Sequence, residues 1–85
     1  MEVVDASYRG LFIRMSEAPS IRELIKLRIS LPNGVQEMHA VVMRVVFENG
    51  RPGVGLRFFA LNGEPKAEWE AFISFALHNR APRAA

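Results

Sequence analysis

Residues 23–32 read ELIKLRISLP, and this stretch decides the fold class. Apolar side chains occupy every second position: Ile25, Leu27, Ile29 and Leu31. The positions between them are polar or charged, and a period of two indicates a β-strand with one buried and one exposed face. Asn33-Gly34 follows almost at once. We expect a tight hairpin turn there, because this dipeptide accepts the positive φ angles that such turns require.

Further segments have the composition of strands. MHAVVMRVVF (38–47) is rich in β-branched residues and predicts a long strand, and residues 54–59 alternate again. GLFIRM (10–15) is another candidate, and EVVDAS (2–7) either extends it or forms a short strand of its own. The Gly- and Pro-containing stretch NGRPG (49–53) predicts a second and looser turn.

After Leu61 the apolar period changes to that of a helix. One stripe recurs at the spacing i, i+3, i+4, i+7 and i+8: Trp69, Phe72, Ile73, Ala76 and Leu77. Pro65 suits the first turn, where its missing N–H costs nothing. We expect Asn79 and Pro82 to end this helix.

These elements predict a mainly β domain of antiparallel strands with one C-terminal α-helix. Short strands and closely spaced turns favour a small barrel or a strongly curled sheet, because curling protects strand edges. The large apolar side chains of the helix are expected to cover one opening or face. We expect a single domain over residues 1–79 and a flexible basic tail over residues 80–85.

The composition argues against several classes of protein. The chain has 85 residues, no cysteine and a net charge of +2. It therefore has no disulfide, thiolate nucleophile or cysteine-ligated metal. No apolar run approaches the roughly 20 residues that span a membrane, and acidic Glu2 and Asp5 do not suit a secretory leader. We expect a cytoplasmic protein that binds neither membranes nor duplex nucleic acid, although the mild positive charge is compatible with a phosphate-bearing ligand.

The sequence offers little for catalysis. His39 and His78 have no second histidine or carboxylate at metal-ligand spacing. None of the five serines lies in a nucleophile-elbow pattern. GRPGVG (50–55) lacks the Lys-Ser/Thr of a phosphate loop and opens a strand instead of a helix. We expect no enzymatic activity, no metal and no cofactor.

The stretch DASYRG (5–10) stands out because an acid, a serine and a glycine precede a strand closely. Asp5 can accept a hydrogen bond from the backbone two residues on, and Ser7 can do so more weakly. Gly10 permits an unusual backbone angle or a close approach by another group. Local chemistry alone favours a well-formed turn without a ligand.

This stretch resembles the D/N-x-S-x-x-G motif of PilZ domains, which are bacterial receptors for the second messenger cyclic di-GMP. The matching residues are Asp5, Ser7 and Gly10. GLFI (10–13) is similar to the strand that follows this motif, and VGLRF (54–58) resembles a late strand of the family. The resemblance extends from Val3 to about Leu77.

The resemblance implies a six-stranded antiparallel barrel that binds its ligand on the outer surface, against the strand with the motif. Asp5 and Ser7 would then offer an acceptor and a donor to a guanine edge or to the local backbone. Gly10 would let the ligand or the chain pack closely. Arg9 would replace part of the phosphate binding that the family places elsewhere.

One element of the family is missing from this chain. PilZ receptors have an upstream R-x-x-x-R motif, whose arginines stack on guanine and hold phosphates. No two arginines here have that spacing, and Arg9 and Arg14 are one residue too far apart. We expect an N-terminally truncated barrel that begins after this motif and after the family's first strand. The loss of two charge-assisted contacts, about 1.5–3 kcal/mol each, predicts nucleotide binding weaker by about two to four decades.

Two functions remain open. The first is a non-enzymatic PilZ-type signalling module that acts through protein partners and binds cyclic di-GMP weakly or not at all. The second is a ligand-independent adaptor, whose open strand edge pairs with another protein or with a second copy as a homodimer.

Overall fold

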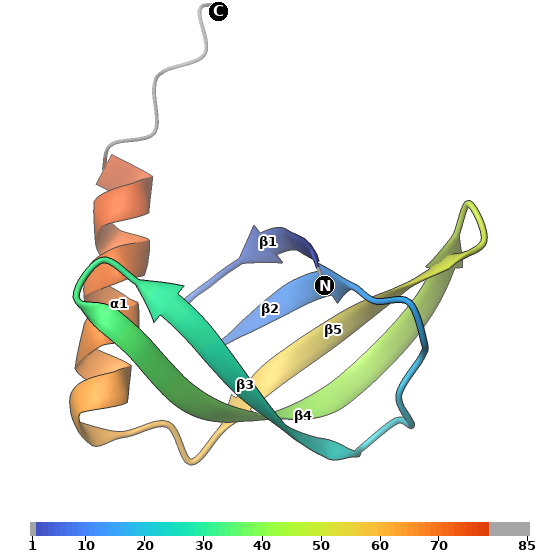
Figure 1. Ribbon diagram of the computed structural model, residues 1–85, viewed down its shortest axis with the longest axis horizontal. Coiled ribbons are helices and arrows are strands. Elements are labelled where there is room, and N and C mark those ends of the chain that lie inside the picture. Colours follow the sequence, from blue (N-terminus) through green and yellow to red (C-terminus); the bar gives the residue numbers. More distant parts are fainter. Residues whose placement is uncertain (1, 79–85) are drawn as a thin grey trace, which may run out of the picture.

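The computed structural model describes residues 2–78 and contains one curled antiparallel sheet and one helix (Figure 1). The elements in chain order are β1 (Glu2–Ala6), β2 (Gly10–Arg14), β3 (Leu24–Leu31), β4 (Gly34–Glu48), β5 (Arg51–Phe59) and α1 (Gly63–His78). The strand order across the sheet is β1-β2-β5-β4-β3. The predicted mainly β fold with a C-terminal helix is confirmed. The predicted tail and the helix ends at Asn79 and Pro82 lie outside the described residues.

The hairpin expected after residues 24–31 is present, with a small shift in its turn. Leu31 pairs directly with Gly34, so that Pro32 and Asn33 form the two-residue loop. The turn is therefore centred one residue earlier than the dipeptide Asn33-Gly34 suggested. Gly34 has a φ of 132°, and it is the first residue of β4.

The second turn is tighter than expected, and the prediction of a loose turn over residues 49–53 is wrong. Glu48 pairs with Arg51, and the loop between them is Asn49-Gly50, whose φ angles are 53° and 76°. Two consecutive residues with positive φ match the twist of the flanking strands, so the chain reverses within two residues. Pro52 and Gly53 lie within β5, which therefore begins before the predicted start at residue 54.

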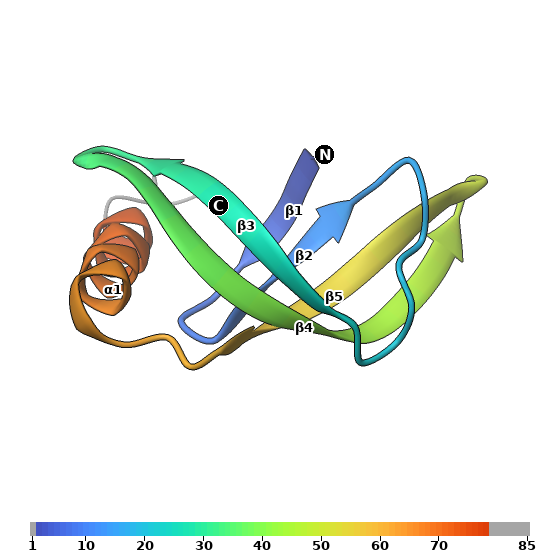
Figure 2. The same cartoon turned by 60° about the horizontal axis from the view of Figure 1, so that its bottom comes forward.

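The sheet curls into a half-barrel whose edge strands, within residues 2–78, are β1 and β3. β4 is the longest strand, and its register with β5 shifts between Val42 and Arg44. Irregularities of this kind bend a strand and increase its twist. Figure 2 shows the result: the β3–β4 hairpin reaches α1 at one end, and the β4–β5 hairpin projects at the other. The described chain thus supplies five of the six strands that the resemblance implied.

The core lies between the concave face of the sheet and α1. Its largest fully buried side chains are Trp69, Ile13, Met38, Val42 and Val54. Ile73 is also buried and Phe72 packs at the margin, as the helical stripe predicted. The last part of the stripe is not buried, since Leu77 is 52% exposed. Figure 1 gives the reason, because the C-terminal end of α1 extends past the β3–β4 hairpin.

Trp69 connects α1 to two other parts of the molecule. Its side chain is 2% exposed, and its ring meets Phe58 of β5 in an edge-to-face arrangement, with centroids 5.1 Å apart. The indole Nε1–H donates a hydrogen bond of 2.9 Å to the carbonyl oxygen of Ser7, which follows β1. The helix is thereby fixed both to the sheet and to the loop between β1 and β2.

Within residues 2–78, no helix combines the length and apolar character needed to cross a membrane.

We expect Trp69→Ala to lower the free energy of unfolding by about 3–5 kcal/mol, as for other buried aromatic residues. Trp69→Phe keeps a buried ring but removes the indole donor, and it should therefore cost less. Urea unfolding followed by circular dichroism measures both variants. A loss below about 1 kcal/mol for Trp69→Ala would show that α1 does not close the core through this side chain.

Candidate functional site

The loop between β1 and β2 is closed by its own polar groups. The Ser7 N–H donates to the carbonyl oxygen of Gly10 at 3.0 Å, and the Ser7 hydroxyl donates to the same oxygen at 3.4 Å. The Asp5 carboxylate accepts a hydrogen bond of 2.9 Å from the Ala6 N–H. Asp5 therefore bonds the next residue, instead of the backbone two residues on. Both side chains are exposed, so each remains accessible to solvent.

Gly10 is required by the contact between β2 and β5. A Cβ atom at this position would lie 2.0 Å from the backbone carbonyl oxygen of Leu56. Gly10 is the direct partner of Arg57 in the ladder, and the Phe58 N–H donates to the Arg9 carbonyl oxygen at 2.9 Å. The glycine of the sequence motif thus has a structural role, whether or not a ligand approaches it.

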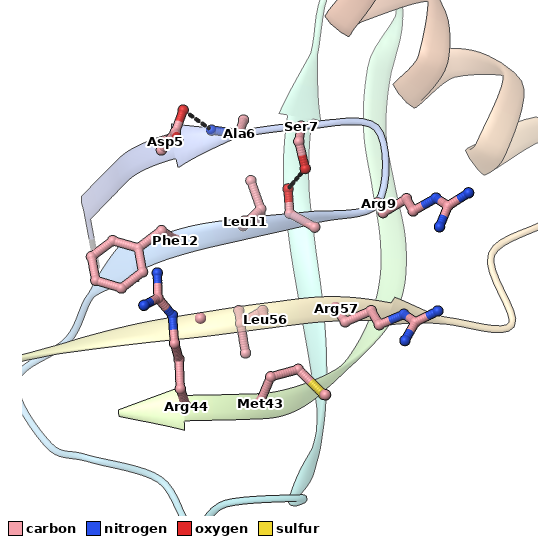
Figure 3. Close-up of a pocket in the computed structure, with 12 residues that line it drawn as sticks. Asp5, Ala6, Ser7, Arg9, Leu11, Phe12, Met43, Arg44, Leu56 and Arg57 are labelled. Carbon is pink, nitrogen blue, oxygen red and sulfur yellow. Dashed lines mark hydrogen bonds between the residues drawn. The ribbon is translucent and has the colours of Figure 1, made fainter. Parts of the chain in front are cut away.

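Two further glycines make room on the outer face of β5. A Cβ on Gly53 would lie 2.5 Å from the Phe12 ring, and one on Gly55 would lie 2.9 Å from Cγ of Arg44. Phe12 of β2 and Arg44 of β4 therefore extend across β5 from opposite sides. The guanidinium carbon of Arg44 is 5.3 Å from the centroid of the Phe12 ring, within the range of a cation–π interaction (Figure 3).

These residues surround a shallow hollow of about 310 Å³ on the outer face of the sheet, which we call the outer hollow. It is lined by Asp5, Ala6, Ser7, Arg9, Gly10, Leu11, Phe12, Met43, Arg44, Gly55, Leu56 and Arg57. Its volume is at the lower end of the range for small-molecule sites, about 300–1,000 Å³. All four site residues predicted from the sequence line it, and the fold adds Phe12, Met43, Arg44 and Arg57.

The outer hollow carries an excess of positive charge. Three arginines and one carboxylate line it: Arg9, Arg44, Arg57 and Asp5. The three arginines are exposed, and the ion pairs found within residues 2–78 involve other side chains. Guanidinium groups that lack a carboxylate partner suit a phosphate, which they can bind through two parallel hydrogen bonds.

Neither histidine belongs to a metal-binding cluster in the described part of the chain. His39 is an exposed residue of β4. Nδ1 of His78 lies 2.8 Å from the carbonyl oxygen of Ser74, at the end of α1. Among residues 2–78, no three His, Cys, Asp or Glu side chains are grouped so that they could hold a metal ion.

A comparison with models of protein families identifies the family of this chain. The model of the PilZ domain matches residues 1–75. The chain belongs to the PilZ domain family. Comparisons with curated proteins and with solved structures gave no significant match. At the level of the family, this PilZ domain is therefore a signalling module of the cyclic di-GMP receptor type, and PilZ domains are non-enzymatic binding modules.

The stretch that resembles the PilZ motif lies at the outer hollow. Asp5, Ser7 and Gly10 line the side of the hollow formed by β1 and β2. Arg44 and Arg57, which the sequence patterns did not point to, line the opposite side from β4 and β5. The sequence did contain one signal for large side chains at this place. Gly53 and Gly55 lie on the same face of a strand, and small residues there leave space for large side chains of neighbouring strands.

We expect Gly10→Ala to destabilise the PilZ domain by about 1–3 kcal/mol or more, because the backbone of β5 cannot move away easily. Gly55→Ala is the matched control, since its added methyl group meets the flexible side chain of Arg44 and should cost less. Thermal unfolding of both variants measures the difference. Equal stability of the two variants would contradict the backbone contact of Gly10.

Proposed function

We propose that this PilZ domain is a non-enzymatic, cytoplasmic effector of cyclic di-GMP signalling that acts through a protein partner. Its own contact with the nucleotide is weak and is made at the outer hollow. The observation that carries the proposal is the meeting of the family motif with three arginines that have no carboxylate partner among the described residues.

The chemistry of the motif side chains suits a guanine base. The Asp5 carboxylate uses one oxygen for the Ala6 N–H and keeps acceptor capacity for the N–H groups of a guanine edge. The hydroxyl bond from Ser7 to Gly10 is long at 3.4 Å, so a ligand acceptor can replace it at little cost. The arginines of the hollow supply charge-assisted donors for the phosphates.

The affinity follows from the arginines that the chain lacks. No R-x-x-x-R occurs in the sequence, so the two arginines that PilZ receptors hold at that spacing have no counterparts in sequence. Each lost charge-assisted hydrogen bond costs about 1.5–3 kcal/mol. Two such losses weaken nucleotide binding by about two to four decades, so contacts with a protein partner carry the main function of the domain.

A specific observation favours one alternative, a ligand-independent adaptor. β1 and β3 form the edges of the sheet over residues 2–78. On β1, Val3 and Val4 are 57% and 47% exposed. An edge strand with apolar side chains is a template for adding a strand from another protein or from a second copy. In this alternative the domain would form a strand-paired homodimer or complex without the nucleotide.

Isothermal titration of the domain with cyclic di-GMP tests the proposal. We expect measurable binding to the wild type, and a dissociation constant at least tenfold higher for Asp5→Ala and Ser7→Ala, because each removes a contact to the ligand. Glu17→Ala and Ser30→Ala are matched controls on exposed residues outside the hollow, and they should bind like the wild type. No binding at millimolar nucleotide, together with a concentration-dependent dimer in light scattering, would replace the proposal by the adaptor.

A further inference from the structure

Two arginines that are 48 positions apart in the sequence lie side by side in the fold. Arg57 pairs in the ladder with Gly10, the residue after Arg9, and the Arg9 carbonyl oxygen accepts the Phe58 N–H. Figure 3 shows the two side chains extending in the same direction, Arg9 from the loop before β2 and Arg57 from β5. Both are exposed, and neither belongs to an ion pair found within residues 2–78.

The arginine pair also separates two hollows. A second hollow of about 510 Å³ is lined by Tyr8, Arg9, Arg57, Phe58, Leu61, Lys66 and Glu70, and we call it the helix hollow because α1 supplies two of these residues. Arg9 and Arg57 line this hollow as well as the outer hollow. Each arginine can therefore be reached from both sides.

Like charges held next to each other favour an anion between them. The two guanidinium groups, one from the loop before β2 and one from β5, repel one another, and a phosphate relieves this repulsion while it accepts their hydrogen bonds. On one side of the pair, Arg44 is held over the Phe12 ring, so a base can stack there with little loss of side-chain freedom. On the other side, Tyr8 offers an aromatic ring, and Lys66 and Glu70 contribute one cation and one carboxylate.

We propose that Arg9 and Arg57 together form the phosphate clamp of this domain. They hold the phosphodiesters of a cyclic dinucleotide on the boundary between the hollows, with one base beside Arg44 and the other beside Tyr8. This inference rests on the proposed function and deepens it. The fold thereby brings together two arginines, one from the loop before β2 and one from β5, although no two arginines in the sequence have R-x-x-x-R spacing.

Titration of the ¹⁵N-labelled domain with cyclic di-GMP tests the clamp by NMR. Arg57→Ala and Arg9→Ala should each raise the dissociation constant about tenfold or more, as expected for the loss of charge-assisted hydrogen bonds. Arg51→Ala is the matched control: Arg51 lies on the same strand as Arg57, is exposed and lines neither hollow. It removes the same charge and should change the dissociation constant less than twofold.

The positions of the shifted amide signals test the placement of the two bases. We expect shifts on both sides of the clamp, at Met43 in the outer hollow and at Lys66 in the helix hollow. Shifts confined to one hollow would overturn the two-sided arrangement. If Arg9→Ala and Arg57→Ala bind like the wild type while Asp5→Ala does not, the clamp is wrong and the proposed function stands.

A second probe separates failure of the clamp from failure of the proposed function. Pyrophosphate, which has no base, should shift the Nε–Hε signals of Arg9 and Arg57 in the wild type but not that of Arg51. If pyrophosphate does so and cyclic di-GMP causes no change, the clamp stands as an anion site and the nucleotide function fails. If neither probe shifts these signals, the clamp itself is overturned. Circular dichroism of each variant verifies that it is folded.

Discussion

The burial of the Trp69 indole, with its single N–H bonded to the carbonyl oxygen of Ser7, is the constraint on which the rest of the structure depends. A half-barrel with two edges does not enclose its own concave face, so α1 must cover it. Trp69 does so through a large apolar surface and an edge-to-face contact with Phe58, which adds about 0.5–1.5 kcal/mol beyond burial. The same side chain fixes the loop after β1, and with it the starting point of Arg9.

Glycine on the outer face is the second requirement for the site. Gly10 lets β2 approach β5, and the small residues of β5 let Phe12 and Arg44 extend over that strand. Side chains from β2 and β4 therefore meet above the backbone of a third strand, β5, without a deep cavity. This explains why the outer hollow is shallow and open instead of enclosed. Such a surface suits a flat, anionic ligand better than a compact apolar one.

Local patterns in the sequence were sufficient for most of the elements, and local chemistry pointed to the residues on one side of the outer hollow. The alternation over residues 25–31 and the helical stripe around Trp69 predicted β3 and α1, because each pattern records which face meets the core. The motif residues 5–10 were found because they are contiguous. Arg57 could not be found in this way, since its place beside Arg9 depends on the pairing of β2 with β5. The tight turn at Asn49-Gly50 was missed because the following Pro-Gly suggested a longer loop, although Pro52 fits inside β5.

The fit of Gly10 against the Leu56 carbonyl oxygen also bears on how sequences of this kind are compared. A domain that had stopped binding any nucleotide would still need a residue without a side chain here, simply to keep two strands in register. The glycine that ends the six-residue motif is therefore required by the fold, and its presence alone does not indicate that a chain binds a nucleotide. A search for working receptors among similar chains should accordingly give weight to the carboxylate and the guanidinium groups, and treat the glycine as a requirement of architecture.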